Sequence, residues 1–500
     1  KVASNAPSKS ELEMYGVGLT VQYELSNWMT VKSITAYRKT KPFSIRDADN
    51  TPLQILETVN SDNIKQFTQE LQFLGDVWDG RLKYQFGAYY FRETDYQFYP
   101  VYLPSQISPT TGEELRVGGL NNNASIKNQS IALFTQESFA ITDKLNLTVG
   151  LRYTRDQKEA TPDETAAASG YGYTNVGYNV AYPAPLSGQT VCLGPPRTGA
   201  AAATCAGSNV YLFDPVLNKK TMSKVTPAAT LQYQWTPELM TYASYSKGFK
   251  GGGFNTRIVQ PGISPNAPTG REFLPEFDPE QVTTYEIGGK LLIGRALRLS
   301  GAGFISKYKD IQIVVREGVA PVVRNAGKAT IKGFELEGTA NPVRPLLINF
   351  GVGYTNFQYD SFTAALEAGQ VGLAPGALGR VDLNDKQAYS PKWSLNGGLS
   401  YRIKVGEGSI TPRADIAYRS KTYFDAPNTE QIAQGKYALV NANIRYEAPG
   451  NRFSLAAGIT NLTNKAYRGS GNSSLTASSG YAEVTYGPPR MFTFEGTYNF

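Results

Sequence analysis

The regular spacing of tight turns and long connections limits the fold of this chain more than any other feature of its sequence. The turns lie at residues 26–27, 76–80, 142–144, 236–238, 294–295, 341–342, 406–408 and 449–451, and the connections at about 43–62, 99–123, 156–222, 251–279, 316–326, 358–390, 420–436 and 465–486. Strict alternation of this kind places all tight turns at one rim of a sheet and all long loops at the other. A soluble sandwich gives no reason for such order, whereas it is the layout of an outer-membrane β-barrel.

The segments between the connections alternate apolar and polar residues, which is typical of two-faced strands. Every second residue is apolar from Leu145 to Tyr153, whereas the intervening positions of later strands carry charges such as Arg413 and Asp415. One face can therefore meet lipid while the other meets water. The mean hydropathy of -0.33 fits this arrangement, because only alternate residues need to be apolar. No apolar run approaches the ~18 residues of a helical span.

About 17 strand segments can be traced along the chain. An odd number cannot close a bacterial single-chain barrel, so the pattern predicts further strands ahead of Lys1. The expected fold is an all-β, transmembrane, antiparallel up-and-down β-barrel. No charged segment followed by an apolar one precedes the first strand, so any signal sequence is expected to lie outside this chain.

Composition excludes several kinds of chemistry. The chain has no histidine, which removes Ser-His-Asp hydrolysis and His-ligated zinc or haem. The formal charge of +7 comes from scattered basic residues and not from a dense tract, so nucleic acid is not an expected partner. We therefore expect no enzymatic activity, no cofactor and no metal site. The triple glycine at 251–253 lacks the Lys-Ser/Thr of a phosphate loop and indicates a flexible strand end.

Several short motifs resemble the barrel of the TonB-dependent outer-membrane receptors, and the resemblance covers essentially the whole chain. The motifs are Phe67 to Leu71, Phe134 to Thr154, Tyr242 to Asn255, Asn325 to Glu337 and Asn461 to Tyr467. The resemblance implies a 22-stranded barrel around a plug domain, with a partner-contacting box ahead of the plug. Neither the plug nor the box is visible here, so residues 1–500 would be a partial barrel domain. The resemblance also implies that Phe492, Phe494, Tyr498 and Phe500 form the signal for the barrel-assembly machinery. The alternative is simply a final amphipathic strand.

Candidate ligand-binding residues lie in the long connections. The aromatic candidates are Tyr96, Tyr99, Tyr102, Tyr171, Tyr173 and Tyr178, and the basic candidates are Arg257, Arg271, Arg316 and Arg324. Tyrosines could stack on a large planar ligand, and arginines could attract an anionic chelate. Ordinary loop packing, an upper aromatic girdle or a solvated charged surface would explain the same residues.

Cys192 and Cys205 lie in the longest connection, which would face an oxidising exterior. This context favours a disulfide that closes part of the loop, and two free thiols are the alternative.

The predicted function is a receptor of the outer membrane of Gram-negative bacteria that binds a scarce small molecule, most simply a ferric siderophore, at its extracellular loops and imports it. The expected partners are outer-membrane lipid and an inner-membrane energising complex, contacted through a missing N-terminal segment, and the barrel is expected to be monomeric. A passive porin is the main alternative. A membrane-embedded hydrolase and a soluble extracellular β-protein are weaker ones. The ligand itself cannot be read from the loops.

Overall fold

The computed structural model describes residues 9–47, 57–102, 105–107, 114–116, 119–166, 210–211, 216–257, 274–317, 320–476 and 480–499. The first strands are β1 (Lys9–Ser26), β2 (Met29–Asp47), β3 (Glu57–Asp62), β4 (Ile64–Val77), β5 (Leu82–Phe98), β6 (Pro100–Tyr102), β7 (Ser105–Ile107), β8 (Glu114–Arg116), β9 (Gly119–Ala140) and β10 (Leu145–Ala166). The middle of the chain holds β11 (Val210–Tyr211), β12 (Asn218–Gln234), β13 (Leu239–Lys250), β14 (Gly253–Phe254), β15 (Glu276–Phe277), β16 (Glu280–Ile293), β17 (Leu297–Glu317), β18 (Ala320–Ala340), β19 (Leu346–Phe362) and the helix α1 (Ala364–Gly369). The last elements are β20 (Trp393–Tyr401), β21 (Ile403–Val405), β22 (Gly408–Arg419), β23 (Tyr437–Glu447), the short 3-10 helix η3 (Pro449–Asn451), β24 (Phe453–Thr460), β25 (Arg468–Ser473), β26 (Ala482–Tyr486) and β27 (Met491–Tyr498).

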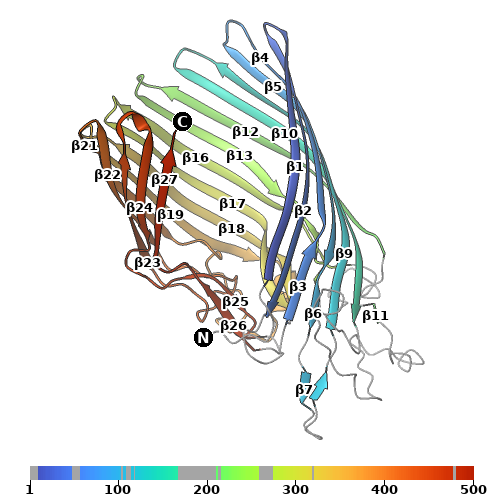
Figure 1. Ribbon diagram of the computed structural model, residues 1–500. Helices are drawn as coiled ribbons and strands as arrows, with labels where there is room; N and C mark the ends of the chain where they lie inside the picture. The colour runs from blue at the N-terminus through green and yellow to red at the C-terminus, as the bar shows by residue number, and fades with distance from the viewer. Residues whose placement is uncertain are drawn as a thin grey trace.

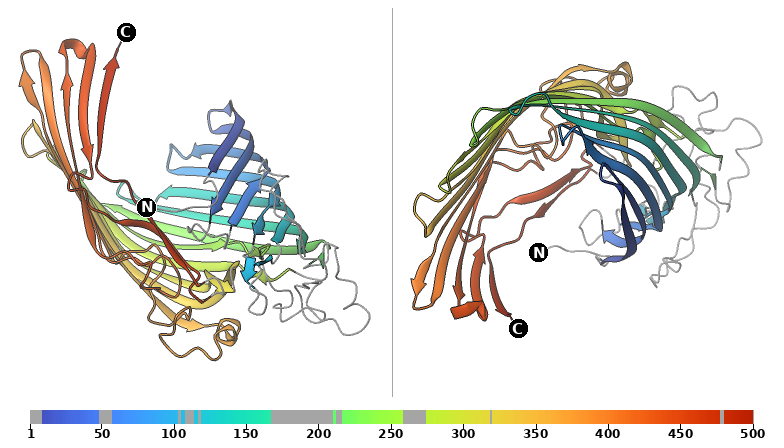
Figure 2. Two further views of the ribbon diagram at one scale, coloured as in Figure 1. Left: turned by 60° about the horizontal axis from the view of Figure 1, so that its bottom comes forward. Right: turned by 90° about the horizontal axis from the view of Figure 1, so that it is seen from above.

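Most of the chain forms one antiparallel sheet of 21 strands that follows chain order (Figure 1). Four short strands prolong longer ones: β3 prolongs β4, β6 prolongs β5, β11 prolongs β12 and β21 prolongs β20. When each short strand is counted together with the strand that it prolongs, the number of strands in the wall agrees with the number expected from the sequence. The sheet curls into an open trough, as Figure 2 shows from the turn side. Within the described residues β1 pairs only with β2, and β27 pairs only with β24. The all-β fold and the turn positions are confirmed.

The two faces of the sheet differ as expected. Apolar side chains such as Val17, Leu231 and Ile287 are 74%, 45% and 68% exposed on the outer wall, where a bilayer would cover them. The inner wall holds polar contacts, for example Arg413 Nη2 donating to Asn349 Oδ1 at 3.0 Å. One charge departs from this pattern, because the register places Glu137 of β9 opposite the lipid-facing Val149 of β10.

Several strands extend well beyond the membrane on the side of the long connections. A transmembrane strand needs about 9–11 residues, whereas β9 and β10 have 22 each and β17 has 21. The connection expected at residues 316–326 is therefore wrong, since the ladder between β17 and β18 continues to the pair Glu317 and Ala320. Its residues alternate too weakly to be recognised as strand from the sequence.

Pro227 fits this long sheet without a bulge. It pairs with Leu151 in an unbroken register, and the ladder between β12 and β13 begins only at Ala228. The proline therefore lies where the partner on that side does not need its missing N–H.

A small apolar core lies outside the lipid band, at the loop-side end of β17 to β19. Its members are Ile311, Ile313, Ala326, Ala329, Ile331, Phe357, Tyr359, Leu366, Val381 and Ala426. Because Leu366 belongs to α1 and Val381 and Ala426 to the connections that follow it, this core fixes those connections onto the extended strands. Among the described residues, no helix is long and apolar enough to span a bilayer.

Candidate functional site

Two segments leave the wall on the side of the long connections and reach the far wall. Figure 2 shows one of them, the hairpin β25–β26 in red, crossing the lumen. We call residues 251–257, which follow β13, the first strap, and the hairpin β25–β26 the second strap. The first strap reaches β5 on the far wall, where Thr256 Oγ1 donates to Gln97 Oε1 at 2.9 Å. The second strap reaches β2, where Arg46 and Glu483 form an ion pair at 3.2 Å. The two straps thus bring together residues from distant parts of the sheet.

The first strap is fixed by a single asparagine and by close packing of its glycines. Asn255 Oδ1 accepts the backbone N–H of Val323 at 2.8 Å, and its Nδ2 donates to the carbonyl of Val323 at 3.1 Å. A Cβ on Gly252 would lie 2.3 Å from the carbonyl oxygen of Phe277. The triple glycine is therefore a packed crossing, and the expectation of a flexible strand end is wrong. The backbone of the strap passes too close to its neighbour for any larger residue.

Three arginines meet where the straps converge: Arg46 of β2, Arg257 of the first strap and Arg316 of β17. Burial lowers the pKa of Arg257, and the nearby positive charges of Arg46 and Arg316 lower it further. Burial also lowers the pKa of Arg316, with Arg46 again contributing. Arg316 contacts the side-chain oxygen of Asn472 on the second strap. Glu483 offsets part of this repulsion, because it pairs with Arg46 and its negative charge raises the pKa of Arg316. A bound anion would relieve the rest.

Arg257 differs from the other two in its partners. Its Nη1 donates to Asn60 Oδ1 at 3.3 Å, and its guanidinium lies 5.2 Å from the ring centroid of Tyr99. Both partners are neutral, and among the residues that the structure describes Arg257 forms no ion pair. Because its direct contacts are neutral, this largely desolvated cation can still accept a charged partner.

An acidic pair stands behind Tyr99 on the same wall. The Tyr99 hydroxyl donates to Asp62 Oδ1 at 2.6 Å. Burial raises the pKa of Asp62, and burial together with Asp62 raises the pKa of Asp95 to about 6. Asp95 lies on β5 five residues beyond Tyr90, toward the long connections, and is therefore outside the part of the strand that lipid would cover. Tyr99 thus contacts both Asp62 and Arg257, and the negative charge of Asp62 raises the pKa of Arg257 against the effect of burial.

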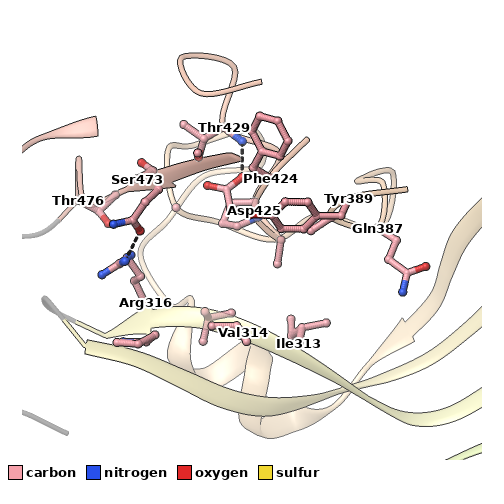
Figure 3. A pocket seen from close by; sticks show the side chains of 18 of the residues that line it. Ile313, Val314, Arg316, Gln387, Tyr389, Phe424, Asp425, Thr429, Ser473 and Thr476 are labelled. Atoms are coloured by element: carbon pink, nitrogen blue, oxygen red, sulfur yellow. Dashed lines mark hydrogen bonds between the residues drawn. The ribbon is translucent and has the colours of Figure 1, made fainter. Parts of the chain in front are cut away.

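A cavity of about 330 Å³ adjoins Arg316 (Figure 3). Ile313 and Val314 of β17 form one wall, and Tyr389 and Phe424 from the connections before β20 and β23 form the other. Asp425 also lines it, and its Oδ1 accepts the backbone N–H of Thr429 at 2.8 Å. The second strap closes one side with Gly471 and Asn472. The cavity is mostly apolar, with charged groups where it meets Arg316 and Asp425.

The structure brings only some of the predicted ligand residues to this site. Tyr99 and Arg257 lie at the strap crossing, and Arg316 lies beside the cavity. Arg324 pairs in the ladder with Ile313, a lining residue. Tyr96 shares the outer-wall row of β5 with Tyr90, so it is on the opposite face from Tyr99. Tyr102 ends β6, and only its backbone is described.

The remaining predicted sites can be placed only in part. Tyr171, Tyr173, Tyr178, Arg271, Cys192, Cys205 and Phe500 lie outside the described residues. Phe492, Phe494 and Tyr498 occupy one row of β27 and are 63%, 85% and 63% exposed. Their role in assembly stays a prediction. No cluster of three metal-ligating side chains occurs in the described part of the chain.

Sequence reasoning missed Arg46, Asn60 and Glu483 and the aromatic wall of the cavity. Arg46 lies near the end of a strand in which charges are frequent, and no motif distinguishes it from them. The signal that could have drawn attention to it is its place at the loop-side end of an inner row, next to Asp47.

Comparisons with known proteins agree with the fold. The model of the family described as TonB dependent receptor-like, beta-barrel matches residues 3–462. The pesticin receptors of Yersinia enterocolitica serotype O:8 / biotype 1B and of Yersinia pestis are each 27% identical over 257 residues, which are 51% of this chain and 33% of the relative. The match thus spans only about a third of the length of these curated relatives.

Two solved structures show the same architecture. The ferric yersiniabactin uptake receptor FyuA from Yersinia pestis superposes with a TM-score of 0.72 at 16% identity, over 99% of this chain and 62% of that one. The closed form of the Ferric-Catecholate import receptor Fiu from K12 E. coli gives 0.66 at 16% identity, over 100% and 65%. Identities this low show the fold alone. Because the family model covers most of the sequence, the chain belongs to the TonB-dependent receptor-like β-barrel family of the outer membrane.

Proposed function

We propose that this chain is the barrel of an outer-membrane importer for an anionic metal chelate, most simply a ferric siderophore. The single observation that carries the proposal is Arg257, a largely buried guanidinium whose partners, Asn60 and Tyr99, are neutral. Arg46 and Arg316 lie close enough to lower its pKa. An anionic ligand would relieve that repulsion and would place a negative charge in direct contact with Arg257.

The neighbouring cavity supports a ligand that combines charge with an organic body. Its walls offer the rings of Tyr389 and Phe424 opposite the aliphatic Ile313, while Arg316 lies at one end. Recognition sites of this kind bury most of a small ligand against apolar groups and orient it with a few charged ones. Ferric siderophores present anionic oxygens around the metal on an organic scaffold. Two relatives of the same fold are described as receptors for ferric yersiniabactin and for ferric catecholates.

Import requires energy, because a scarce ligand must move into the periplasm against its gradient. We propose that a plug domain fills the lumen of the full-length protein and that an inner-membrane complex, acting through a segment outside this chain, drives its rearrangement. The straps would then hold the ligand above the plug. A passive channel is the alternative, and the two straps across the lumen disfavour it because they narrow the path.

Binding of ferric chelates to the purified full-length protein tests the site. The variant Arg257→Gln should weaken binding of the preferred anionic chelate by about 10 to 100-fold, since a charge-assisted hydrogen bond contributes roughly 1.5–3 kcal/mol. Arg257→Lys should lose less, because it keeps the charge but not the planar fork. Arg298→Gln, at the turn-side end of β17, is the matched control and should bind normally. Unchanged affinity in Arg257→Gln would rule out this site.

Uptake by cells that depend on the chelate for iron tests the transport step separately. Uptake should stop when the inner-membrane energy source is dissipated, although binding at the cell surface persists. Deleting the plug should convert a nearly non-conducting protein into a large pore in planar bilayers. Free conduction by the intact protein, with uptake indifferent to energy, would make it a porin instead.

A further inference from the structure

The second strap is a small sheet of its own, and its base and its far end are held by different contacts. Within the described residues β25 and β26 pair only with each other and not with the large sheet. At the base, the backbone N–H of Arg468 donates to Gln434 Oε1 at 2.6 Å, and Arg468 Nη1 donates to the carbonyl of Ala433 at 2.7 Å. These bonds fix the base to the connection that precedes β23. The far end reaches the opposite wall without a ladder, so its position there depends on side-chain contacts.

Glu483 makes the contact between the far end of the strap and β2. Its Oε1 pairs with Arg46 Nη2 at 3.2 Å and accepts a hydrogen bond from Asn472 Nδ2 at 2.8 Å. Asn472 and Glu483 lie directly opposite each other in the hairpin, and Asn472 also contacts Arg316. The side chain of Glu483 is 17% exposed, whereas that of Arg46 is 50% exposed. The carboxylate is therefore packed against the strap, while part of the guanidinium of Arg46 remains open to an incoming anion.

Glu483 also acts on the other arginines at the point where the straps converge. Its negative charge raises the pKa of Arg316 against the effect of burial, and Asp425 acts in the same direction with a smaller effect. Arg46 lowers the pKa of both Arg257 and Arg316. A carboxylate of the second strap thus lies against Arg46, where the negative charge of a bound ligand would otherwise relieve this repulsion.

We propose that Glu483 is an internal competitor of the ligand, which holds Arg46 in the ligand-free protein and is displaced from it when an anionic chelate binds. This inference rests on the proposed import of an anionic chelate. A guanidinium that donates its paired N–H groups to one carboxylate cannot donate the same groups to a second anion. The ligand and Glu483 therefore exclude each other at Arg46. Because the base of the strap is fixed separately at Arg468, its far end can leave β2 while the strap stays attached to its own wall.

This competition makes Glu483 a residue that determines which ligands bind. Exchanging Glu483 for the single carboxylate of a monoanion leaves the charge beside Arg46 unchanged, so it gains little. A chelate with several anionic oxygens around one metal ion acts on Arg46, Arg257 and Arg316 together and gains more than the displaced ion pair contributed. The substrate class that fits this site is therefore a compact polyanionic chelate, such as a ferric tris-catecholate.

The sign of one change in affinity tests the competition. Glu483→Gln keeps the shape of the side chain and removes its charge, so the full-length protein should bind the trianionic ferric tris-catecholate about three- to tenfold more tightly. The affinity for a neutral ferric tris-hydroxamate should not change. The matched control is Glu495→Gln, because Glu495 pairs with Arg445 at the same 3.2 Å on the inner wall of β27, and this variant should bind as the parent does. If Glu483 only anchors the strap, Glu483→Gln loosens it and weakens binding instead.

A double-mutant cycle separates competition for Arg46 from simple repulsion of the ligand by Glu483. In the background of Arg46→Gln, the change Glu483→Gln should tighten binding less than it does in the parent, since no ion pair remains to be displaced. An equal gain in both backgrounds would mean that Glu483 acts only through its charge at a distance, and the proposal would be wrong.

Hydrogen exchange of residues 468–486 tests the contact without any ligand. These amides should exchange faster in Glu483→Gln than in the parent protein and in Glu495→Gln, because the far end of the strap opens more often. The proposal is overturned if exchange in Glu483→Gln is unchanged, or if this variant binds the tris-catecholate no more tightly than the parent. A loss of affinity in Arg257→Gln together with no gain in Glu483→Gln would leave the import proposal standing and remove only the role of Glu483.

Discussion

Leu231 offers the sharpest test of which face of the sheet meets lipid. It is 45% exposed on the outer wall of β12 and pairs with Leu147 on one side and Ala243 on the other, so no charge adjoins it. Its neighbour Gln232 points to the lumen. The apolar row of β12 runs from Val225 to Tyr233, which places Leu231 two residues from its centre. At ~3.3 Å per residue and a tilt of about 40°, that is roughly 5 Å from the midplane.

An arginine near the midplane of a barrel costs about 2–4 kcal/mol, and the cost falls to about 0–1 kcal/mol near the interfaces. We therefore expect Leu231→Arg to lower the free energy of unfolding by about 2 kcal/mol, roughly a 30-fold change in the folding equilibrium. Gln232→Arg should cost less than about 1 kcal/mol because its charge stays in water. Reversible denaturant titration of the full-length protein in lipid vesicles measures both. Equal losses, or a larger loss for Gln232→Arg, would refute the assignment of the two faces.

Three further predictions concern parts outside the lipid band. Cys192 and Cys205 should be linked by a disulfide, so that the intact mass after alkylation without reductant shows neither thiol modified. Closing a loop of about 14 residues should contribute roughly 3 kcal/mol to the free energy of unfolding. Two alkylated thiols would contradict this prediction. Gly252→Ala should destabilise the first strap by about 1–3 kcal/mol, because the added Cβ would lie 2.3 Å from the carbonyl oxygen of Phe277. Gly251→Ala is the control and should be tolerated, because no atom would lie nearer than 3.6 Å to its Cβ. Equal melting temperatures of the two variants would contradict the packing. Burial raises the pKa of Asp95 from 3.8 to about 6, so the folded state binds this proton more tightly than the unfolded state and loses stability as the pH rises through that range. Asp95→Asn should therefore stabilise the protein at pH 7 and change its stability little at pH 4. Denaturant titration at both pH values measures the difference.

The membrane part of this fold could be predicted because its rules are local. The alternation of apolar and polar residues, together with a tight turn at one rim, defines each hairpin independently of the rest of the chain. The strands and turns can therefore be predicted from the sequence. The loop-side ends could not be predicted in the same way. The extension of β17 and β18 to Glu317 and Ala320 is stabilised by the apolar core around Ile313 and Tyr359, whose members come from three strands, the helix α1 and two connections.

The candidate site was partly predicted for a related reason. Arg257 could be selected as a basic residue in a long connection, but its partner Asn60 lies 197 residues away, and Arg316 contacts Asn472 across 156 residues. No period or motif connects such positions, since they meet only because two straps cross the lumen. Arg46 could not be selected from the sequence for the same reason, because it joins the candidate site only where the second strap reaches β2 through Glu483.

The alternation that allows the barrel strands to be predicted gives no indication of which polar residues form the candidate binding site. A water-lined inner wall accepts any polar side chain, so 49 lysines and arginines along the chain give little reason to select one of them. What distinguishes Arg257 is its environment: it is largely desolvated, two other guanidiniums lie nearby, and its own partners are neutral. Desolvating a cation whose direct partners are neutral costs free energy, and a bound anion would lower that cost.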